Sequence, residues 1–153
     1  MARLAVVSGG GTGIGRAIAE RFVQGGDGVV IVGRRGAVLA AAAAELNAAC
    51  GADRVTTEVA DLADPQDVEA VARAIGNRGA VDVLVLNAGG NFGGEPSSLV
   101  ETADGWRRDF DGNVLTAVLL TEALETALRL PDRPGERRDG ARSRLSTIRA
   151  ATP

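Results

Sequence analysis

The chain has 153 residues, the length of one domain with a substantial core. Its formal net charge is −3, from 17 basic and 20 acidic residues, so nucleic acid is not an expected partner. No apolar run is long enough to span a membrane and no secretory signal opens the sequence, so we expect a cytoplasmic protein. With no histidine and one cysteine, Cys50, the sequence predicts no transition-metal site.

The first predicted unit is a strand, a glycine-rich turn and a helix. Residues 3–7 form an apolar run typical of a buried strand, and from Ile14 to Gly25 apolar residues recur at helical spacing. Free N–H groups and the positive end of a helix dipole attract an anion, and glycines let a pyrophosphate approach the backbone. A plain tight turn is the alternative. We predict a dinucleotide site that includes Ser8, Gly9, Gly11, Thr12, Gly13, Ile14 and Gly15.

Strands and helices alternate along the rest of the chain. The apolar runs at 29–32 and 81–86 and the segment 54–59 predict three further strands. The alanine-rich segment 38–50 and the segment that follows Asp64-Pro65 predict the helices between them. A helical region capped by Thr102 and a long helix over residues 113–130 follow. The alternation predicts an α/β fold, a Rossmann-type doubly wound parallel sheet in three layers, with ligands at the carboxyl ends of the strands.

Composition divides the chain near residue 130. Residues 129–153 contain seven of the 17 arginines and three of the five prolines. We interpret residues 1–130 as a dinucleotide-binding domain and residues 131–153 as an arginine- and proline-rich tail. The tail is either a solvated terminus or a remnant of a fifth strand. The predicted sheet is therefore truncated after the fourth strand and the long helix.

Four motifs, in this order and spacing, resemble those of the short-chain dehydrogenase/reductase family. The matching residues are Ser8-Gly9 with Gly13 and Gly15 for the glycine fingerprint, Asp61-Leu62 for the pair beside the adenine ring, Asn87-Ala88-Gly89 for the motif after the fourth strand, and Asn113 for the catalytic asparagine. The first motif departs from the family pattern by a serine in place of threonine. The resemblance covers residues 3 to about 130. It implies an NAD(P)-dependent oxidoreductase that interconverts a small-molecule alcohol and carbonyl by hydride transfer.

The loop after the second predicted strand favours NADP over NAD. An NAD site of this fold places Asp or Glu about 20 residues past the glycines, on the ribose 2′-hydroxyl. This chain has Arg34 and Arg35 in that region and no acid. Arginine binds a 2′-phosphate bidentately. The alternative is that both arginines are simply solvated.

The catalytic pattern of the family is incomplete in this chain. The resemblance implies a serine followed by Tyr-x-x-x-Lys, in which a phenol with a pKa near 10 exchanges protons beside a cation. Residues 145–148 are weakly similar to the serine region, with Thr147 nearest the catalytic serine, but the chain contains no tyrosine and no lysine. Three explanations stay open: a fragment, a reading frame lost after about Leu130, and a non-catalytic NADP-binding pseudoenzyme.

The predicted helix over residues 113–130 carries apolar side chains on more than one face, among them Val118, Leu119 and Leu124. In the family that the chain resembles, this helix packs against its copy in a partner subunit. An apolar surface stripe needs burial. We therefore predict a homo-oligomer that forms through this helix.

Overall fold

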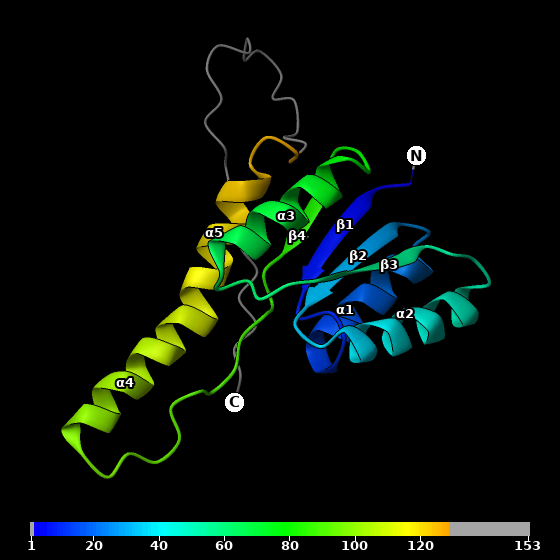
Figure 1. The fold of residues 1–153 in the computed structure, drawn as a ribbon. Helices are drawn as coiled ribbons and strands as arrows, with labels where there is room; N and C mark the ends of the chain where they lie inside the picture. The colour runs from blue at the N-terminus through cyan, green and yellow to red at the C-terminus, as the bar shows by residue number, and fades with distance from the viewer. Residues whose placement is uncertain (1, 129–153) are drawn as a thin grey trace, which may run out of the picture.

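The computed structural model describes residues 2–128 and contains one sheet with helices on both faces (Figure 1). In chain order the elements are β1 (Leu4–Ser8), α1 (Gly13–Gln24), β2 (Gly28–Gly33), α2 (Gly36–Cys50), β3 (Val55–Val59), α3 (Pro65–Gly76), β4 (Val83–Val85), α4 (Leu99–Phe110), the π-helical η1 (Asp111–Leu115) and α5 (Thr116–Leu124). The predicted tail, residues 131–153, lies outside the described residues. None of the helices in residues 2–128 is both long and apolar enough to cross a membrane.

The four strands run parallel in the order β3-β2-β1-β4. The chain moves from β1 through β2 to β3 in one direction and then returns to the other side of β1 to form β4. In doubly wound sheets, the crevice at such a reversal is where ligands bind, outside the carboxyl ends of the strands. Here that crevice lies between the ends of β1 and β4. The predicted α/β class with a parallel sheet is confirmed.

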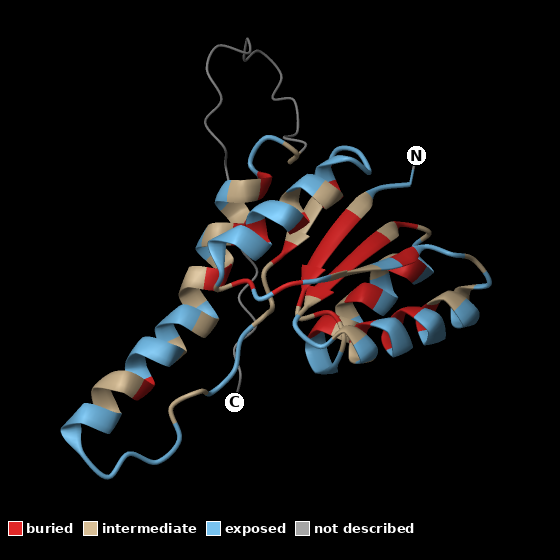
Figure 2. Cartoon of the chain, in the orientation of Figure 1, coloured by how far each residue is buried: buried red, intermediate tan, exposed pale blue. Residues whose placement is uncertain are grey.

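Alternate residues of the strands pack on opposite faces of the sheet, as the pleat requires. Val7 and Ile31 pack into one apolar cluster with α1 and α2. Val6 and Val30 pack into a second cluster with α3 and α5. Because both faces are covered, β1 and β2 are buried along almost their whole length (Figure 2). The predicted three layers are therefore present.

An ion pair between the exposed Arg3 and the buried Asp27 lies at the amino ends of the strands, opposite the crevice. The carboxylate of Asp27, which is buried, accepts a hydrogen bond from Arg3 Nη2 at 2.7 Å and another from the Arg3 backbone N–H at 3.1 Å. These hydrogen bonds outweigh the cost of burial and hold the pKa of Asp27 below its ordinary value. The first strand is thus fixed in register by charge at one end.

The cap of α4 differs from the prediction. Ser98, not Thr102, is the N-cap, and its hydroxyl accepts a hydrogen bond from the Glu101 N–H. Thr102 lies inside the helix and donates its hydroxyl to the Ser98 carbonyl. Glu101 accepts from the Ser97 N–H and hydroxyl, which lowers the pKa of Glu101. Serine and threonine are both good caps, so local preference did not decide between them.

The predicted boundaries around residue 113 and in the fourth strand were wrong. A continuous helical segment runs from α4 through η1 into α5, and α5 ends at Leu124. Gly112 and Asn113 are poor helix formers, yet the helical segment continues through them. The strand predicted over 81–86 is only Val83–Val85, while Val81 forms an isolated parallel bridge with Leu128.

The apolar surface of this helical segment lies mainly on α4. Leu124 is fully buried and Leu119 packs partly against the α3 side of the core, so neither provides the predicted surface stripe. Val118 stays exposed. Figures 1 and 2 show α4 extending away from the sheet with much of its surface exposed. Its large exposed apolar side chains are Leu99, Val100, Trp106 and Phe110.

Candidate functional site

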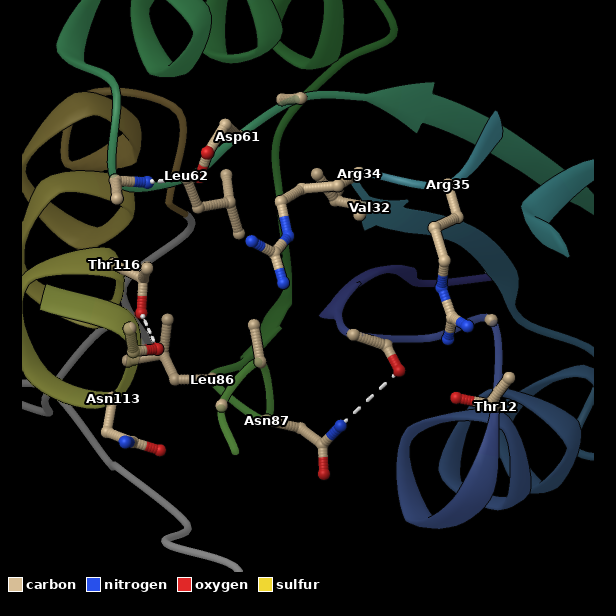
Figure 3. Close-up of a pocket in the computed structure, with 18 of the residues that line it drawn as sticks. Thr12, Val32, Arg34, Arg35, Asp61, Leu62, Leu86, Asn87, Asn113 and Thr116 are labelled. Atoms are coloured by element: carbon tan, nitrogen blue, oxygen red, sulfur yellow. Dashed lines mark hydrogen bonds between the residues drawn. The ribbon is translucent and has the colours of Figure 1, made fainter. Parts of the chain in front are cut away.

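A cavity of about 830 Å³ opens at the carboxyl ends of the strands (Figure 3). Its volume is in the range of pockets that hold cofactors. Eleven of the residues expected at a dinucleotide site line it: Gly9, Gly11, Thr12, Ile14, Arg34, Arg35, Asp61, Leu62, Asn87, Ala88 and Gly89. Asn113 also lines the cavity, whereas Ser8, Gly13 and Gly15 do not. Thr147 lies outside the described residues.

The glycine turn after β1 brings the amino end of α1 against the cavity. Gly9 and Gly13 have φ of +67° and +54°, a region that favours glycine. A Cβ on Gly15 would overlap the Gly9 carbonyl oxygen and lie 2.5 Å from Asn87 Nδ2. Thr12 caps the helix without a side-chain hydrogen bond, and the first turn contains no acidic residue. The first N–H groups of α1 and its positive dipole end are therefore suited to an anion.

Ser8 joins the ends of β1 and β4 beneath the cavity. Its buried hydroxyl accepts hydrogen bonds from the N–H groups of Asn87 and Ala88, at 2.9 and 3.0 Å. The same hydroxyl donates to the Val85 carbonyl at 3.3 Å, and Asn87 Nδ2 donates to the Ser8 carbonyl at 3.2 Å. A hydroxyl can fill this position because it both donates and accepts. Ser8 therefore holds the two loops of the crevice together without lining it.

Two arginines at the end of β2 point toward the cavity without a carboxylate partner. In Figure 3 the Arg34 guanidinium lies within the pocket and the Arg35 side chain extends toward Thr12. Among residues 2–128, neither arginine forms an ion pair, whereas Arg16 pairs with Glu45 at 2.6 Å. Both Arg34 and Arg35 are exposed. The β2 side of the cavity therefore presents two cations available to an anionic ligand.

The loop after β3 provides an apolar wall and one exposed acid. Leu62 is buried to 4% exposure yet lines the cavity. Asp61 is exposed, and its Oδ1 accepts a hydrogen bond from the Ala63 N–H at 3.1 Å. The Asp61 N–H in turn donates to Asp67 on α3 at 2.8 Å. These bonds fix the loop that places Leu62 in the cavity wall.

Asn113 lies in the π-helical turn and its amide is fully engaged by backbone. Its Oδ1 accepts from the Gly90 N–H at 2.9 Å, and its Nδ2 donates to the carbonyls of Gly90 and Asp109, each at 2.8 Å. The Asp109 carbonyl is the one that the N–H of residue 113 would bond in an α-helix. Gly89 permits this contact, since its Cβ would lie 2.5 Å from Asn113 Oδ1. Asn113 thus ties the loop after β4 to the helix, with both N–H donors used.

Several cavity residues were not identified from sequence. Phe92, Arg108, Val114 and Thr116 all line the cavity, and Phe92 is the aromatic residue among the lining side chains. Phe92 is the one aromatic residue in a glycine-rich loop that the core does not require. An aromatic residue in such a loop could have identified it as a cavity residue. Within residues 2–128 no three acidic or thiol side chains lie together as metal ligands would.

Comparison with known proteins gives consistent matches. A model of the short chain dehydrogenase family matches residues 3–137. A probable oxidoreductase from Streptomyces antibioticus is 39% identical over 127 residues, which cover 83% of this chain and 41% of that protein.

Two solved structures are similar in fold and sequence. L-Sorbose reductase from Gluconobacter frateurii, complexed with NADPH and L-sorbose, is 34% identical with a TM-score of 0.71 and covers 82% of this chain and 47% of its own. A 3-ketoacyl-(acyl-carrier-protein) reductase from Brucella melitensis, complexed with NADH, is also 34% identical, with a TM-score of 0.70 and coverage of 82% and 49%. The chain spans less than half the length of each of these relatives.

We expect Gly15→Ala to lower both stability and dinucleotide binding. The added methyl would overlap the Gly9 carbonyl, and overpacking of this kind costs about 1–3 kcal/mol. The matched control is Gly76→Ala, a helical glycine of α3 with nothing within 4 Å of the new Cβ. That change should raise stability by about 0.5–1 kcal/mol. Urea unfolding measures the stability of both variants. Equal effects of the two substitutions on stability would contradict the steric role of Gly15.

Proposed function

The chain belongs to the short chain dehydrogenase family, and we propose that it is the NADP-binding part of a cytoplasmic oxidoreductase. The whole enzyme would interconvert a small-molecule alcohol and carbonyl by hydride transfer, which the bound nicotinamide supplies. The proposal rests on the cavity at the β1–β4 crevice. Here the amino end of α1, which has no side-chain cap hydrogen bond, meets two arginines without a carboxylate partner among residues 2–128.

Each part of the cavity has a role in this proposal. The N–H groups at the start of α1 bind the pyrophosphate, and the glycine turn allows its close approach. Leu62 and Val114 provide apolar surface for the adenine, and Asp61 lies at its edge. Arg34 and Arg35 bind the ribose 2′-phosphate, because a guanidinium pairs with a phosphate through two parallel hydrogen bonds. The residues present fit a phosphorylated dinucleotide.

The preference for NADP is argued from charge. The loop after β2 carries two arginines and no acid. It therefore attracts the 2′-phosphate of NADP and offers no carboxylate to accept a hydrogen bond from the ribose 2′-hydroxyl of NAD. The two solved relatives differ in the cofactor with which they were complexed, one with NADPH and one with NADH. The preference of this chain is therefore assigned from its own residues.

The wild-type chain should bind NADPH more tightly than NADH, and Arg34→Asp should narrow or reverse that preference. The substitution replaces a phosphate-binding cation by a carboxylate that repels the 2′-phosphate and accepts from a 2′-hydroxyl. Fluorescence titration of each cofactor gives the two dissociation constants. Arg73→Asp, on α3 away from the cavity lining, makes the same charge change as a control. Equal affinities of the wild-type chain for both cofactors would contradict the assignment.

A second candidate function is dinucleotide binding without turnover. It is favoured by the absence of tyrosine and lysine from the sequence and by the engagement of the Asn113 amide with backbone groups. The reductase would then require an acid and an amine from elsewhere. A fragment of a longer enzyme, a frame-shifted product and a pseudoenzyme each fit this chemistry.

A polypeptide of this sequence should show no measurable reductase activity with NADPH. General acid–base catalysis contributes about 10²–10⁴-fold, and no side chain here replaces the phenol–ammonium pair. Loss of NADPH absorbance would be followed across a panel of ketones and aldehydes, with cofactor binding measured on the same sample. Robust turnover by material whose intact mass matches this sequence would refute the prediction.

We also propose that the chain self-associates through α4. Leu99, Trp106 and Phe110 follow one another at i, i+7 and i+11, which places them on one face of the helix. Each is more than half exposed, at 87%, 73% and 56%. An exposed apolar stripe of this length is typical of an interaction surface.

Trp106→Glu should shift the chain toward monomer without loss of fold, because the charge would be buried in the association and stays solvated in the monomer. Arg107→Glu, at the adjacent exposed position, changes charge without removing apolar area and serves as the comparison. Sedimentation velocity at tens of micromolar measures the distribution. A monodisperse wild-type monomer would contradict self-association.

A further inference from the structure

Arg34 is held from across the cleft by the aromatic ring of Phe92. The guanidinium carbon lies 5.8 Å from the centroid of the ring, within cation–π range. Arg34 follows β2, and Phe92 belongs to the loop that follows β4, so the two residues come from different walls of the cavity. Among residues 2–128, Arg34 contacts the Phe92 ring and has no carboxylate partner.

The chemistry of this contact differs from that of an ion pair. A carboxylate partner would neutralise the arginine and occupy its N–H donors. An aromatic ring attracts the cation through its π face and leaves the donors at the guanidinium edge free. Arg34 is therefore restrained and still able to form the two parallel hydrogen bonds that a phosphate accepts.

Phe92 is itself fixed by the end of the helical segment. Its N–H donates to Asp109 Oδ1 at 2.7 Å, and its carbonyl accepts from Arg108 Nε at 3.2 Å. Its ring fills the space beside Gly112, where any Cβ would overlap the ring. The residue is half-buried, so the ring has a defined place rather than a free range of rotamers. The position of Arg34 is thus set by contacts that begin in α4 and η1.

We propose that Phe92 is a positioning residue for Arg34 that strengthens binding of the cofactor's 2′-phosphate specifically. This inference rests on the proposed NADP function and deepens it by naming a residue that acts through Arg34. Preorganisation of a long, rotamer-rich side chain reduces the ordering cost that binding would otherwise incur. The effect falls on ligands that carry the 2′-phosphate and not on those that lack it.

The test compares adenosine 2′,5′-bisphosphate with 5′-AMP by isothermal titration calorimetry. Phe92→Leu keeps an apolar side chain and removes the π face, so it should weaken the bisphosphate about 2–5-fold and leave 5′-AMP unchanged. Phe92→Tyr keeps the ring and should retain wild-type discrimination. Phe22→Leu makes the same substitution at a phenylalanine of α1 that contacts Arg3 outside the cavity lining, and should change neither affinity. In an Arg34→Leu background, Phe92→Leu should have no further effect.

A second readout needs no ligand. In the wild-type chain, the Arg34 side-chain protons should show upfield ring-current shifts in NMR spectra, and these shifts should disappear in Phe92→Leu. Their absence from wild type would overturn the proposal even if the variant failed to fold.

The outcomes separate the two claims. If wild type binds both probes equally, the NADP preference fails and this inference fails with it. If wild type prefers the bisphosphate and Phe92→Leu keeps that preference, only the inference fails. It also fails if Phe92→Leu weakens both probes alike, or if it tightens both, as removal of a barrier across the cleft would.

Discussion

The site depends on the buried hydroxyl of Ser8. It accepts two N–H groups from the loop after β4 and donates to the Val85 carbonyl, so it joins the two strand ends between which the sheet order reverses. A buried serine without partners would be costly, whereas one with three partners fixes both loops. The N–H of Gly9 extends the same network by bonding the Val32 carbonyl at the end of β2. The start of α1 is thereby held against the cavity.

Charge is distributed differently at the two ends of the sheet. At the amino ends, Arg3 is paired with the buried Asp27, and this pairing contributes to the fold. At the carboxyl ends, Arg34 and Arg35 have no carboxylate partner among the described residues, and exposed cations of this kind contribute little to stability. The same residue type therefore serves structure at one end and is available to an anionic ligand at the other. Both Arg3 and Arg34 are exposed, so what differs is the buried Asp27 carboxylate that accepts from Arg3.

The helical segment from α4 to α5 connects three features of the molecule. Its exposed α4 face carries the apolar stripe, and its π-helical turn places Asn113 against Gly90. The end of α4 also fixes Phe92, which contacts Arg34. The amide of Asn113 is thus used to hold a loop, and the chemistry that the family performs with a phenol and an amine has no counterpart in this sequence.

The sequence alone determined the layered fold and twelve of the 25 residues that line the cavity, because those follow from local periodicity and short motifs. The glycine turn, the buried strands and the Asp64-Pro65 helix start are each encoded within a few neighbouring residues. Only the tertiary structure decided the course of the chain through Gly112 and Asn113. Local propensity indicates a helix boundary there, but contacts with Phe92 and Gly90, about 20 residues away, stabilise a continuous helical segment. The contact between Arg34 and Phe92 likewise joins residues far apart in sequence, which only the packing of β1 between β2 and β4 brings together.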